Sequence, residues 1–134
     1  MGVFVDTSAL YAALSTRDEC HDRARTQWTV LLNEDGDLVT SNYVLVETMA
    51  LLGRRLGLQA VRDFQTAFVP ILDVSWIEAV LHDRALSALL AANTRELSLV
   101  DCTSFEVMRT LGLQTAFAFD DHFRAQGFHM LPDA

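Results

Sequence analysis

The chain has 134 residues, of which 51% are hydrophobic, and it carries a formal net charge of −8 at pH 7. This length and apolar content predict one globular domain spanning residues 1–134, with enough chain to bury a core. Apolar stretches such as residues 85–92 are too short to cross a bilayer, so we expect no membrane contact. The N-terminus has no basic region and holds Asp6 beside its apolar segment, which argues against a secretory signal and favours a cytoplasmic protein.

Cysteine content and charge exclude further classes of protein. Cys20 and Cys102 are too few for a disulfide framework and do not have the spacing of a zinc site. All ten basic residues are arginine, and the acidic balance is the main observation against a nucleic-acid-binding protein, because phosphate contacts need positive charge. Locally clustered arginines, a dimer that pools them, or a substrate held through metal ions would each reconcile an acidic chain with RNA.

Hydrophobic periodicity, helix caps and turn residues predict strands and helices in alternation. In chain order, we expect a strand at 3–5, a helix ending near 14, a helix at 19–32, a strand at 38–40, helices at 44–55 and 59–68, a strand at 71–74, a helix ending near 92, a helix from 98 or 99 to 111, a strand at 115–119, a short helix near 122–126 and a strand at 128–130. Ser75 and Glu78 are expected to form a capping box before the helix that ends near 92. This alternation predicts an α/β fold, a three-layer α/β/α sandwich with a short-stranded, mostly parallel central sheet.

Four acidic residues end or interrupt apolar segments, where a buried carboxylate is costly unless it is neutralised. They are Asp6, Glu47, Asp101 and Asp120. Ligands of open parallel sheets bind beyond the carboxyl ends of the strands, so Asp6 and Asp120, which follow strands, are expected at one sheet edge. A site made of carboxylates alone favours Mg²⁺ or Mn²⁺, the ions of phosphoryl chemistry.

Each of these acids also has a simpler interpretation. Asp6 and Asp120 suit the N-cap of the helix that follows each of them, and Asp101 forms a capping-box pattern with Ser98. Glu47 has no such role, because it lies on an otherwise apolar helical stripe. It either faces solvent beside that stripe or points inward, where it would need a cation.

Four segments together resemble a known family of nucleases. They are residues 5–10, 44–47, 97–105 and 118–123. They look like the successive motifs of PIN-domain ribonucleases, and the nearest match is the VapC-type toxins of bacterial and archaeal toxin–antitoxin pairs. The resemblance covers essentially the whole chain.

The resemblance implies a role for the four acids and for partner molecules. Asp6, Glu47, Asp101 and Asp120 would bind one or two Mg²⁺ or Mn²⁺ ions and cleave RNA to leave a 5′-phosphate and a 3′-hydroxyl. Members of the family usually form homodimers and are inhibited by a small antitoxin protein, whose C-terminal segment covers the acidic groove. The apolar helices expected at 44–56 and 59–68 are candidate surfaces for these contacts, or are simply part of the core.

Other residues of these motifs are candidates for supporting roles. Ser8 and Ser104 match small hydroxyl positions near the site, although helix capping or packing also explains them. The residue after the fourth acid is often basic in the family but is Asp121 here, which leaves open whether Asp120 or Asp121 is the ligand. We favour Asp120, because it directly follows the predicted strand. Among the histidines, only His122 is singled out, by its place near the fourth acid.

Three arginines near the first two helices are candidates for RNA contact, or are solvated: Arg17, Arg23 and Arg25.

Two other functions compete with the nuclease. A haloacid-dehalogenase-type phosphatase is disfavoured, because it wants a second acid at the position of Ser8 and a lysine, which the chain lacks. A non-catalytic PIN-fold module for protein or RNA binding is disfavoured by the intact acids.

Overall fold

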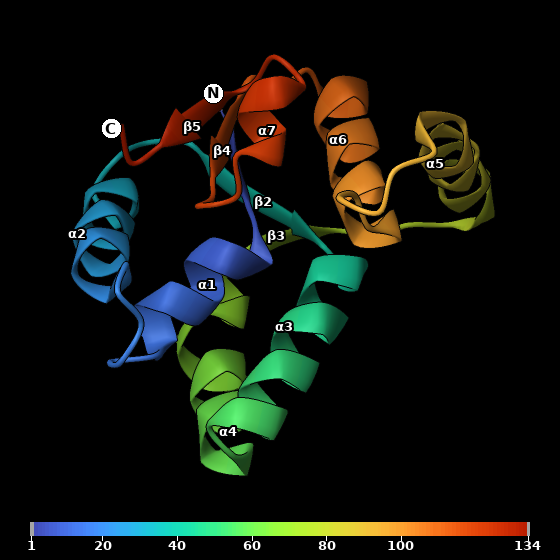
Figure 1. Cartoon of the computed structure of the whole chain (residues 1–134). Coiled ribbons are helices and arrows are strands. Elements are labelled where there is room, and N and C mark those ends of the chain that lie inside the picture. Colours follow the sequence, from blue (N-terminus) through green and yellow to red (C-terminus); the bar gives the residue numbers. More distant parts are fainter. Residues whose placement is uncertain (1, 134) are drawn as a thin grey trace.

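A computed structural model describes residues 2–133, in which strands and helices alternate (Figure 1). The strands are β1 (Gly2–Val5), β2 (Asp37–Ser41), β3 (Asp73–Ser75), β4 (Thr115–Phe117) and β5 (His129–Leu131). The α-helices are α1 (Thr7–Leu14), α2 (His21–Leu32), α3 (Asn42–Arg55), α4 (Leu58–Ala67), α5 (Ala79–Ala92), α6 (Leu99–Leu111) and α7 (His122–Ala125), and a 3₁₀ turn, η1 (Val69–Ile71), precedes β3. Within the described part of the chain, no helix combines the length and hydropathy that a membrane span requires.

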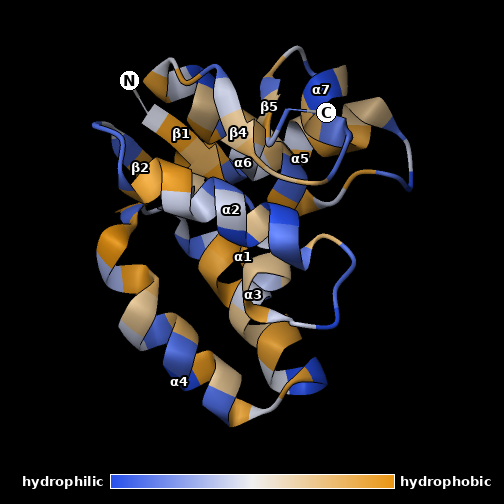
Figure 2. Cartoon of the chain, turned by 90° about the vertical axis from the view of Figure 1, so that its left-hand side faces the viewer, coloured by the Kyte–Doolittle hydropathy of each residue, from blue (hydrophilic) through white to orange (hydrophobic). Residues whose placement is uncertain are grey.

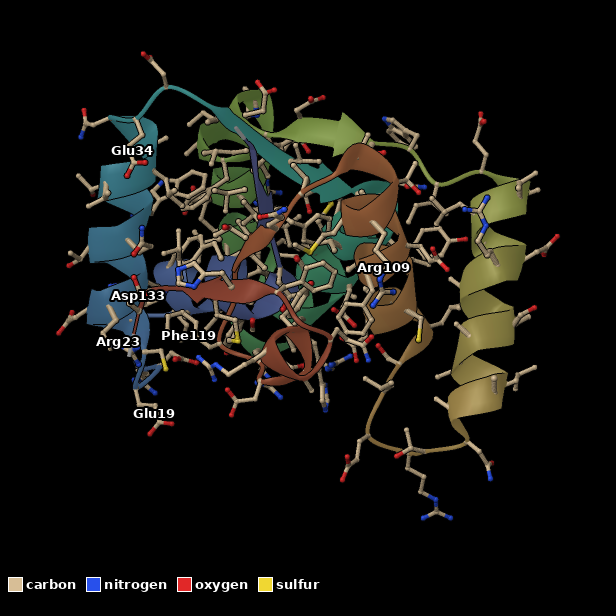
Figure 3. All side chains as sticks on the ribbon, turned by 90° about the horizontal axis from the view of Figure 1, so that it is seen from above. Glu19, Arg23, Glu34, Arg109, Phe119 and Asp133 are labelled. Carbon is tan, nitrogen blue, oxygen red and sulfur yellow. The ribbon has the colours of Figure 1, made fainter. Side chains whose placement is uncertain are left out.

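The five strands form one sheet in the order β3-β2-β1-β4-β5, and all four pairings between neighbours are parallel. Helices lie on both sides of this sheet, with α2 on one side and α6 on the other, and α5 packs outside α6 (Figures 1 and 3). Parallel strands need such crossover helices, which bury both faces of the sheet. The predicted three-layer α/β/α fold with a short-stranded parallel sheet is therefore confirmed.

The centre of the sheet is the most buried part of the molecule. Phe4 and Val5 of β1 are fully buried, as the run of β-branched and aromatic residues predicts, and Phe117 of β4 beside them is buried too. Figure 2 shows β1 and β2 as largely apolar, whereas α4 alternates apolar and polar residues along its length. This helix buries Phe64 completely and leaves Leu58 68% exposed, so it contributes one face to the core.

Several expectations about element boundaries are wrong, and three of them have a clear physical reason or matter for the site. Ser75 and Glu78 form no capping box: α5 begins at Ala79 without a side-chain cap, and the extended segment before it is held by Ile77 N, which donates to Asn42 Oδ1 over 2.6 Å. The strand expected at 71–74 lies at 73–75, because η1 occupies the residues around Pro70. The strand expected at 115–119 ends at Phe117.

The strand order reverses between β1 and β4, and this reversal places the site. Ligands of open α/β sheets bind in the crevice beyond the carboxyl ends of strands at such a switch point. Asp6 N donates to Phe117 O over 3.0 Å and so ties the two strand ends together. The starts of α1, α3 and α6 lie at this same edge of the sheet (Figure 1).

Candidate functional site

An acidic cleft of about 460 Å³ opens at the carboxyl edge of the sheet. All four acids predicted from the sequence line it: Asp6, Glu47, Asp101 and Asp120. They come from four separate segments, namely the end of β1, the middle of α3, the first turn of α6 and the loop after β4. The fold therefore brings the four carboxylates of the sequence pattern to one place.

Asp6 is the most buried of the four acids, with 5% of its surface exposed. It is the N-cap of α1, and Asp6 Oδ2 accepts hydrogen bonds from Ser8 N over 3.1 Å and from Ser8 Oγ over 2.7 Å. Burial raises the pKa of Asp6 to about 6, against the lowering effect of the Ser8 bonds and with a further increase from Asp101 and Glu47. Asp6 thus has a capping role and a site role at once, and its Oδ1 accepts no bond from the described residues.

Asp101 combines the same two roles. Asp101 Oδ2 accepts a hydrogen bond from Ser98 N over 2.9 Å, and Asp101 N donates to Ser98 Oγ over 3.1 Å, which is the capping box predicted from the sequence. Its side chain is 16% exposed, and burial raises its pKa, with a smaller increase from the neighbouring Asp120. The cap fixes this carboxylate at the wall of the cleft.

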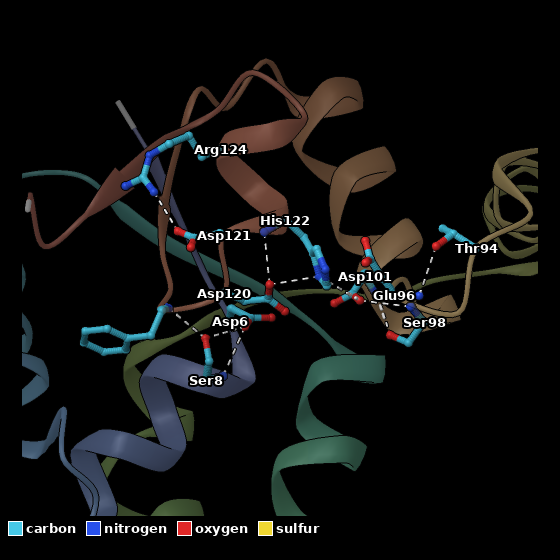
Figure 4. Close-up of polar contacts among 11 residues, drawn as sticks. Asp6, Ser8, Thr94, Glu96, Ser98, Asp101, Asp120, Asp121, His122 and Arg124 are labelled. Carbon is cyan, nitrogen blue, oxygen red and sulfur yellow. Dashed lines mark hydrogen bonds and ion pairs between the residues drawn. The ribbon is translucent and has the colours of Figure 1, made fainter.

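Asp120 and Asp121 point in different directions (Figure 4). Asp120 lines the cleft, and its Oδ1 accepts a hydrogen bond from His122 N over 3.0 Å. The Asp121 side chain is 84% exposed and pairs with Arg124 over 2.6 Å. Asp120 lies three residues beyond the end of β4 and does not follow the strand directly, but it is the member of the pair that faces the other acids.

His122 lies beside these acids. Its Nδ1 is 2.9 Å from Asp120 Oδ1 and 3.8 Å from Asp101 Oδ2 (Figure 4). This nitrogen is buried and makes no well-aligned hydrogen bond with any described residue. Ligand atoms of Asp101, Asp120 and His122 all lie within 4.8 Å of one another, so the three side chains are close enough to share one ion. The carboxylate oxygens of the two acids fit a hard divalent cation.

Glu47 is half-buried on α3 and lines the cleft, on the helical face that points toward the other acids. The cleft-lining residues of α3 are Glu47, Ala50, Leu51 and Arg54. Their spacing of three, four and seven residues places them on one helical face. Arg54 is the single basic residue among the described residues that line the cleft, and it was not predicted as a site residue, although its seven-residue spacing from Glu47 places it on the same helical face.

The remaining candidates lie outside the cleft lining, with one exception. Ser8 lines it, and Ser8 Oγ also accepts a hydrogen bond from Phe119 N over 2.9 Å. Ser104 is fully buried within α6 and donates to Val100 O over 3.0 Å, which satisfies its hydroxyl inside the helix. Thr7 and Ser98 line the cleft as well, and neither was predicted from the sequence to be a site residue.

None of the three arginines expected near RNA lines the cleft. Arg23 lies over the Phe119 ring, 5.4 Å from its centroid (Figure 3), and Arg25 lies 5.8 Å from the centroid of Phe68. Arg17 is exposed. Cation–π contact with the protein's own rings thus accounts for two of them.

An apolar groove of about 350 Å³ adjoins the acidic cleft. It is lined by Asn42, Tyr43, Val46, Glu47 and Val100. Glu47 lines both the acidic cleft and this groove. Val46, which lines the groove, is 68% exposed. The groove therefore offers an apolar surface next to the carboxylates.

Known proteins resemble the chain over nearly its whole length. Residues 3–128 match the family model of the PIN domain. The chain is 39% identical over 127 residues to a Mycobacterium tuberculosis protein named 23S rRNA-specific endonuclease VapC20, a match that covers 94% of this chain and 95% of that protein. The crystal structure of M. tuberculosis VapC20, described as a Sarcin-Ricin loop cleaving toxin, matches with a TM-score of 0.84 and 38% identity over 94% of this chain and 95% of that one.

More distant structures have the same fold. VapBC2 from Rickettsia felis, bound to a DNA fragment from its promoter, matches with a TM-score of 0.71 and 12% identity over 97% of both chains. FitAcB from Neisseria gonorrhoeae matches with a TM-score of 0.69 and 14% identity over 97% of this chain and 96% of that one. At these identities the likeness concerns the fold alone.

Proposed function

The chain belongs to the PIN-domain family, and on that premise we propose that it is a metal-dependent endoribonuclease and the toxin of a type II toxin–antitoxin pair. The observation that carries this proposal is the gathering of four carboxylates in one cleft at the switch point of the sheet. Identity of 39% to an endonuclease toxin across 94% of the chain supports it independently. We propose that residues 1–134 form a single nuclease domain that acts in the cytoplasm.

We propose that Asp6, Glu47, Asp101 and Asp120 hold one or two Mg²⁺ or Mn²⁺ ions. Such an ion, when bound, activates water and neutralises the charge that develops on the scissile phosphate. The role of the protein is to present ionised carboxylates in fixed positions, with Asp6 held by Ser8 and Asp101 held by Ser98. Because burial raises the pKa values of Asp6 and Asp101, protons compete with the metal for these two groups.

The acidic chain needs a local positive charge to hold RNA, and Arg54 supplies one inside the cleft. At 1.5 Å per helical residue, Arg54 lies about 10 Å along α3 from Glu47. We propose that its guanidinium binds a phosphate neighbouring the scissile one. M. tuberculosis VapC20 is named a 23S rRNA-specific endonuclease, and we propose the same substrate class for this chain, an exposed loop of large-subunit ribosomal RNA.

Two apolar surfaces support proposals about partners. The groove beside Glu47 suits an apolar segment of a small antitoxin, which from there would reach over the carboxylates. Helix α5 buries only Ala85 of its 14 residues and leaves Val80 71% and Leu90 68% exposed. Exposed apolar surface of this kind marks an interaction site, and we propose that α5 contacts a second copy of the chain in a homodimer.

Cleavage of ribosomal RNA tests the proposed function. The purified, partner-free chain is incubated with ribosomes or total RNA and Mn²⁺ or Mg²⁺, in parallel with EDTA and with Asp6→Asn. Discrete fragments with 5′-phosphate ends that disappear with EDTA and with Asp6→Asn are expected. Absence of both cleavage and metal binding would instead support the non-catalytic binding module.

A further inference from the structure

A fifth side chain, the imidazole of His122, lies beside the carboxylates and offers a nitrogen as a potential ligand atom. His122 follows Asp120 by two residues at the start of α7, and its ring turns back toward the acids (Figure 4). The backbone fixes this turn, because His122 N donates to Asp120 Oδ1 over 3.0 Å while Phe123 is fully buried in the core. The backbone of α7 and the buried Phe123 therefore fix the position of the His122 ring beside the acids.

The distances around His122 Nδ1 suit a shared ion. In an octahedral site with ligands about 2.1 Å from the metal, adjacent ligand atoms lie about 3 Å apart and opposite ones about 4.2 Å apart. His122 Nδ1 is 2.9 Å from Asp120 Oδ1 and 3.8 Å from Asp101 Oδ2. All three ligand atoms lie within 4.8 Å of one another, so small side-chain movements suffice.

A hydrogen bond alone does not account for this nitrogen. Although Nδ1 approaches Asp120 Oδ1 closely, the contact is not aligned as a hydrogen bond, and the buried atom has no other partner among the described residues. A buried polar atom without a partner is unusual, and a bound ion is one explanation for it. The other three histidines have contacts elsewhere: His21 with Ala12 O, His82 with Tyr43 and His129 with Asp133.

We infer that His122 Nδ1 is a direct ligand of the metal ion held by Asp101 and Asp120, and that this nitrogen makes the site favour first-row transition ions such as Mn²⁺ over Mg²⁺. The inference rests on the proposed metal-dependent function and adds one ligand to it. Mg²⁺ prefers oxygen and gives up water reluctantly, whereas imidazole binds transition ions well. Neutral imidazole also adds a ligand without adding negative charge to a crowded anionic site.

Pulsed EPR of Mn²⁺ bound to the full-length protein tests the ligand directly. A coupling between the Mn²⁺ electron spin and a ¹⁴N nucleus is expected in the unaltered protein, with the modulation changed by ¹⁵N-histidine labelling. The coupling should be lost in His122→Gln and kept in the matched control His129→Gln, because His129 lies on β5 and pairs with Asp133.

Metal titration supplies the second measurement. Loss of a group that supports a metal site costs 10- to 100-fold in affinity, and we expect the Kd for Mn²⁺ to rise about tenfold in His122→Gln. The Kd for Mg²⁺, measured by competition, should rise less than about threefold, because Mg²⁺ relies on the carboxylates.

The outcomes separate this inference from the proposed function. Bound Mn²⁺ without nitrogen coupling, or an unchanged Kd in His122→Gln, would overturn the histidine ligand and leave the carboxylate site intact. Failure of the unaltered protein to bind Mn²⁺ at all would overturn both. If His122→Gln does not fold, the spectrum of the labelled, unaltered protein decides alone.

Discussion

Ser8 donates two hydrogen bonds to a single oxygen of Asp6, one from its hydroxyl over 2.7 Å and one from its backbone N–H over 3.1 Å. Both bonds end on Oδ2, and Oδ1 remains available at the wall of the cleft. The same hydroxyl accepts a bond from Phe119 N, which joins the loop before Asp120 to the start of α1. Ser8 is therefore a positioning residue for two of the four acids.

Ser8→Ala should destabilise the protein and raise the pKa of Asp6. The variant leaves Phe119 N without its partner, a loss that costs about 1–3 kcal/mol of unfolding free energy. It also removes the hydroxyl bond that lowers the pKa of Asp6, so half-maximal Mn²⁺ binding should move to higher pH. Ser104→Ala is the matched control, because that hydroxyl bonds only within its own helix. An unchanged pH midpoint in Ser8→Ala would contradict the positioning role.

Asp6→Asn should stabilise the metal-free protein at neutral pH. Aspartate has an ordinary pKa of 3.8, and burial raises that of Asp6 to about 6 in the folded state. Between these values the folded state binds more protons than the unfolded state, so the wild-type protein loses stability as pH rises through this window. The unfolding free energy of Asp6→Asn should therefore exceed that of the wild type by about 3 kcal/mol above pH 6, and this excess should vanish below pH 4.

Urea unfolding in EDTA from pH 3.5 to 8 measures this difference. Asp6→Asn should be more stable than wild type at pH 7.5 and equal to it at pH 3.5, while RNA cleavage is lost at every pH. A variant that is less stable by the same amount at both pH values would show that Asp6 acts mainly as a helix cap.

The frame of the fold was predictable from the sequence because local signals agreed with the tertiary structure. The strand at 3–5, in which Phe4 and Val5 are fully buried, the Ser98–Asp101 capping box and the stop at Gly112, where φ is 70°, all appear as expected. The Ser75–Glu78 pattern failed because a distant contact, from Ile77 N to Asn42 Oδ1, overrides the local cap.

The site was predictable only in part, because contacts between distant segments place some of its residues. Asp6 and Asp120 both lie beyond strand ends, so sheet topology brings them together, and the helical periodicity of α3 places Glu47 on the face that lines the cleft. Arg54 and the approach of His122 Nδ1 to Asp101 depend on how α3, α6 and α7 meet, which no local pattern encodes. The choice between Asp120 and Asp121 likewise needed the direction of each side chain.

Asp120→Asn should abolish Mn²⁺ binding at the site, whereas Asp121→Asn should leave it unchanged. Only Asp120 lines the cleft, and Asp121 pairs with Arg124 outside it. Thermal unfolding reports the difference, because Mn²⁺ at 100 times its Kd stabilises a binding protein by about 2.7 kcal/mol. A loss of this stabilisation in Asp121→Asn with retention in Asp120→Asn would reverse the assignment.

If the proposed homodimer forms through α5, Leu90→Glu should convert it into a monomer. Leu90 is 68% exposed on α5, and a buried glutamate at an apolar interface would be desolvated without a partner. Light scattering after gel filtration measures the mass. Leu111→Glu, at a 52% exposed position of α6, is the control that should keep the dimer. Equal masses for wild type and Leu90→Glu would exclude α5 as the contact.

Arg54→Ala should weaken RNA binding without removing the chemistry. The variant loses one phosphate contact, so KM for RNA should rise about tenfold while kcat stays within about twofold, and the salt slope of binding should fall by roughly 0.7 for single-stranded RNA. Arg55→Ala is the matched control, because Arg55 occupies the same last turn of α3 but lies over the Tyr11 ring, 5.5 Å from its centroid. Both variants lose one charge at the same helix end, so equal salt slopes would show that the effect is general electrostatics and not contact within the cleft.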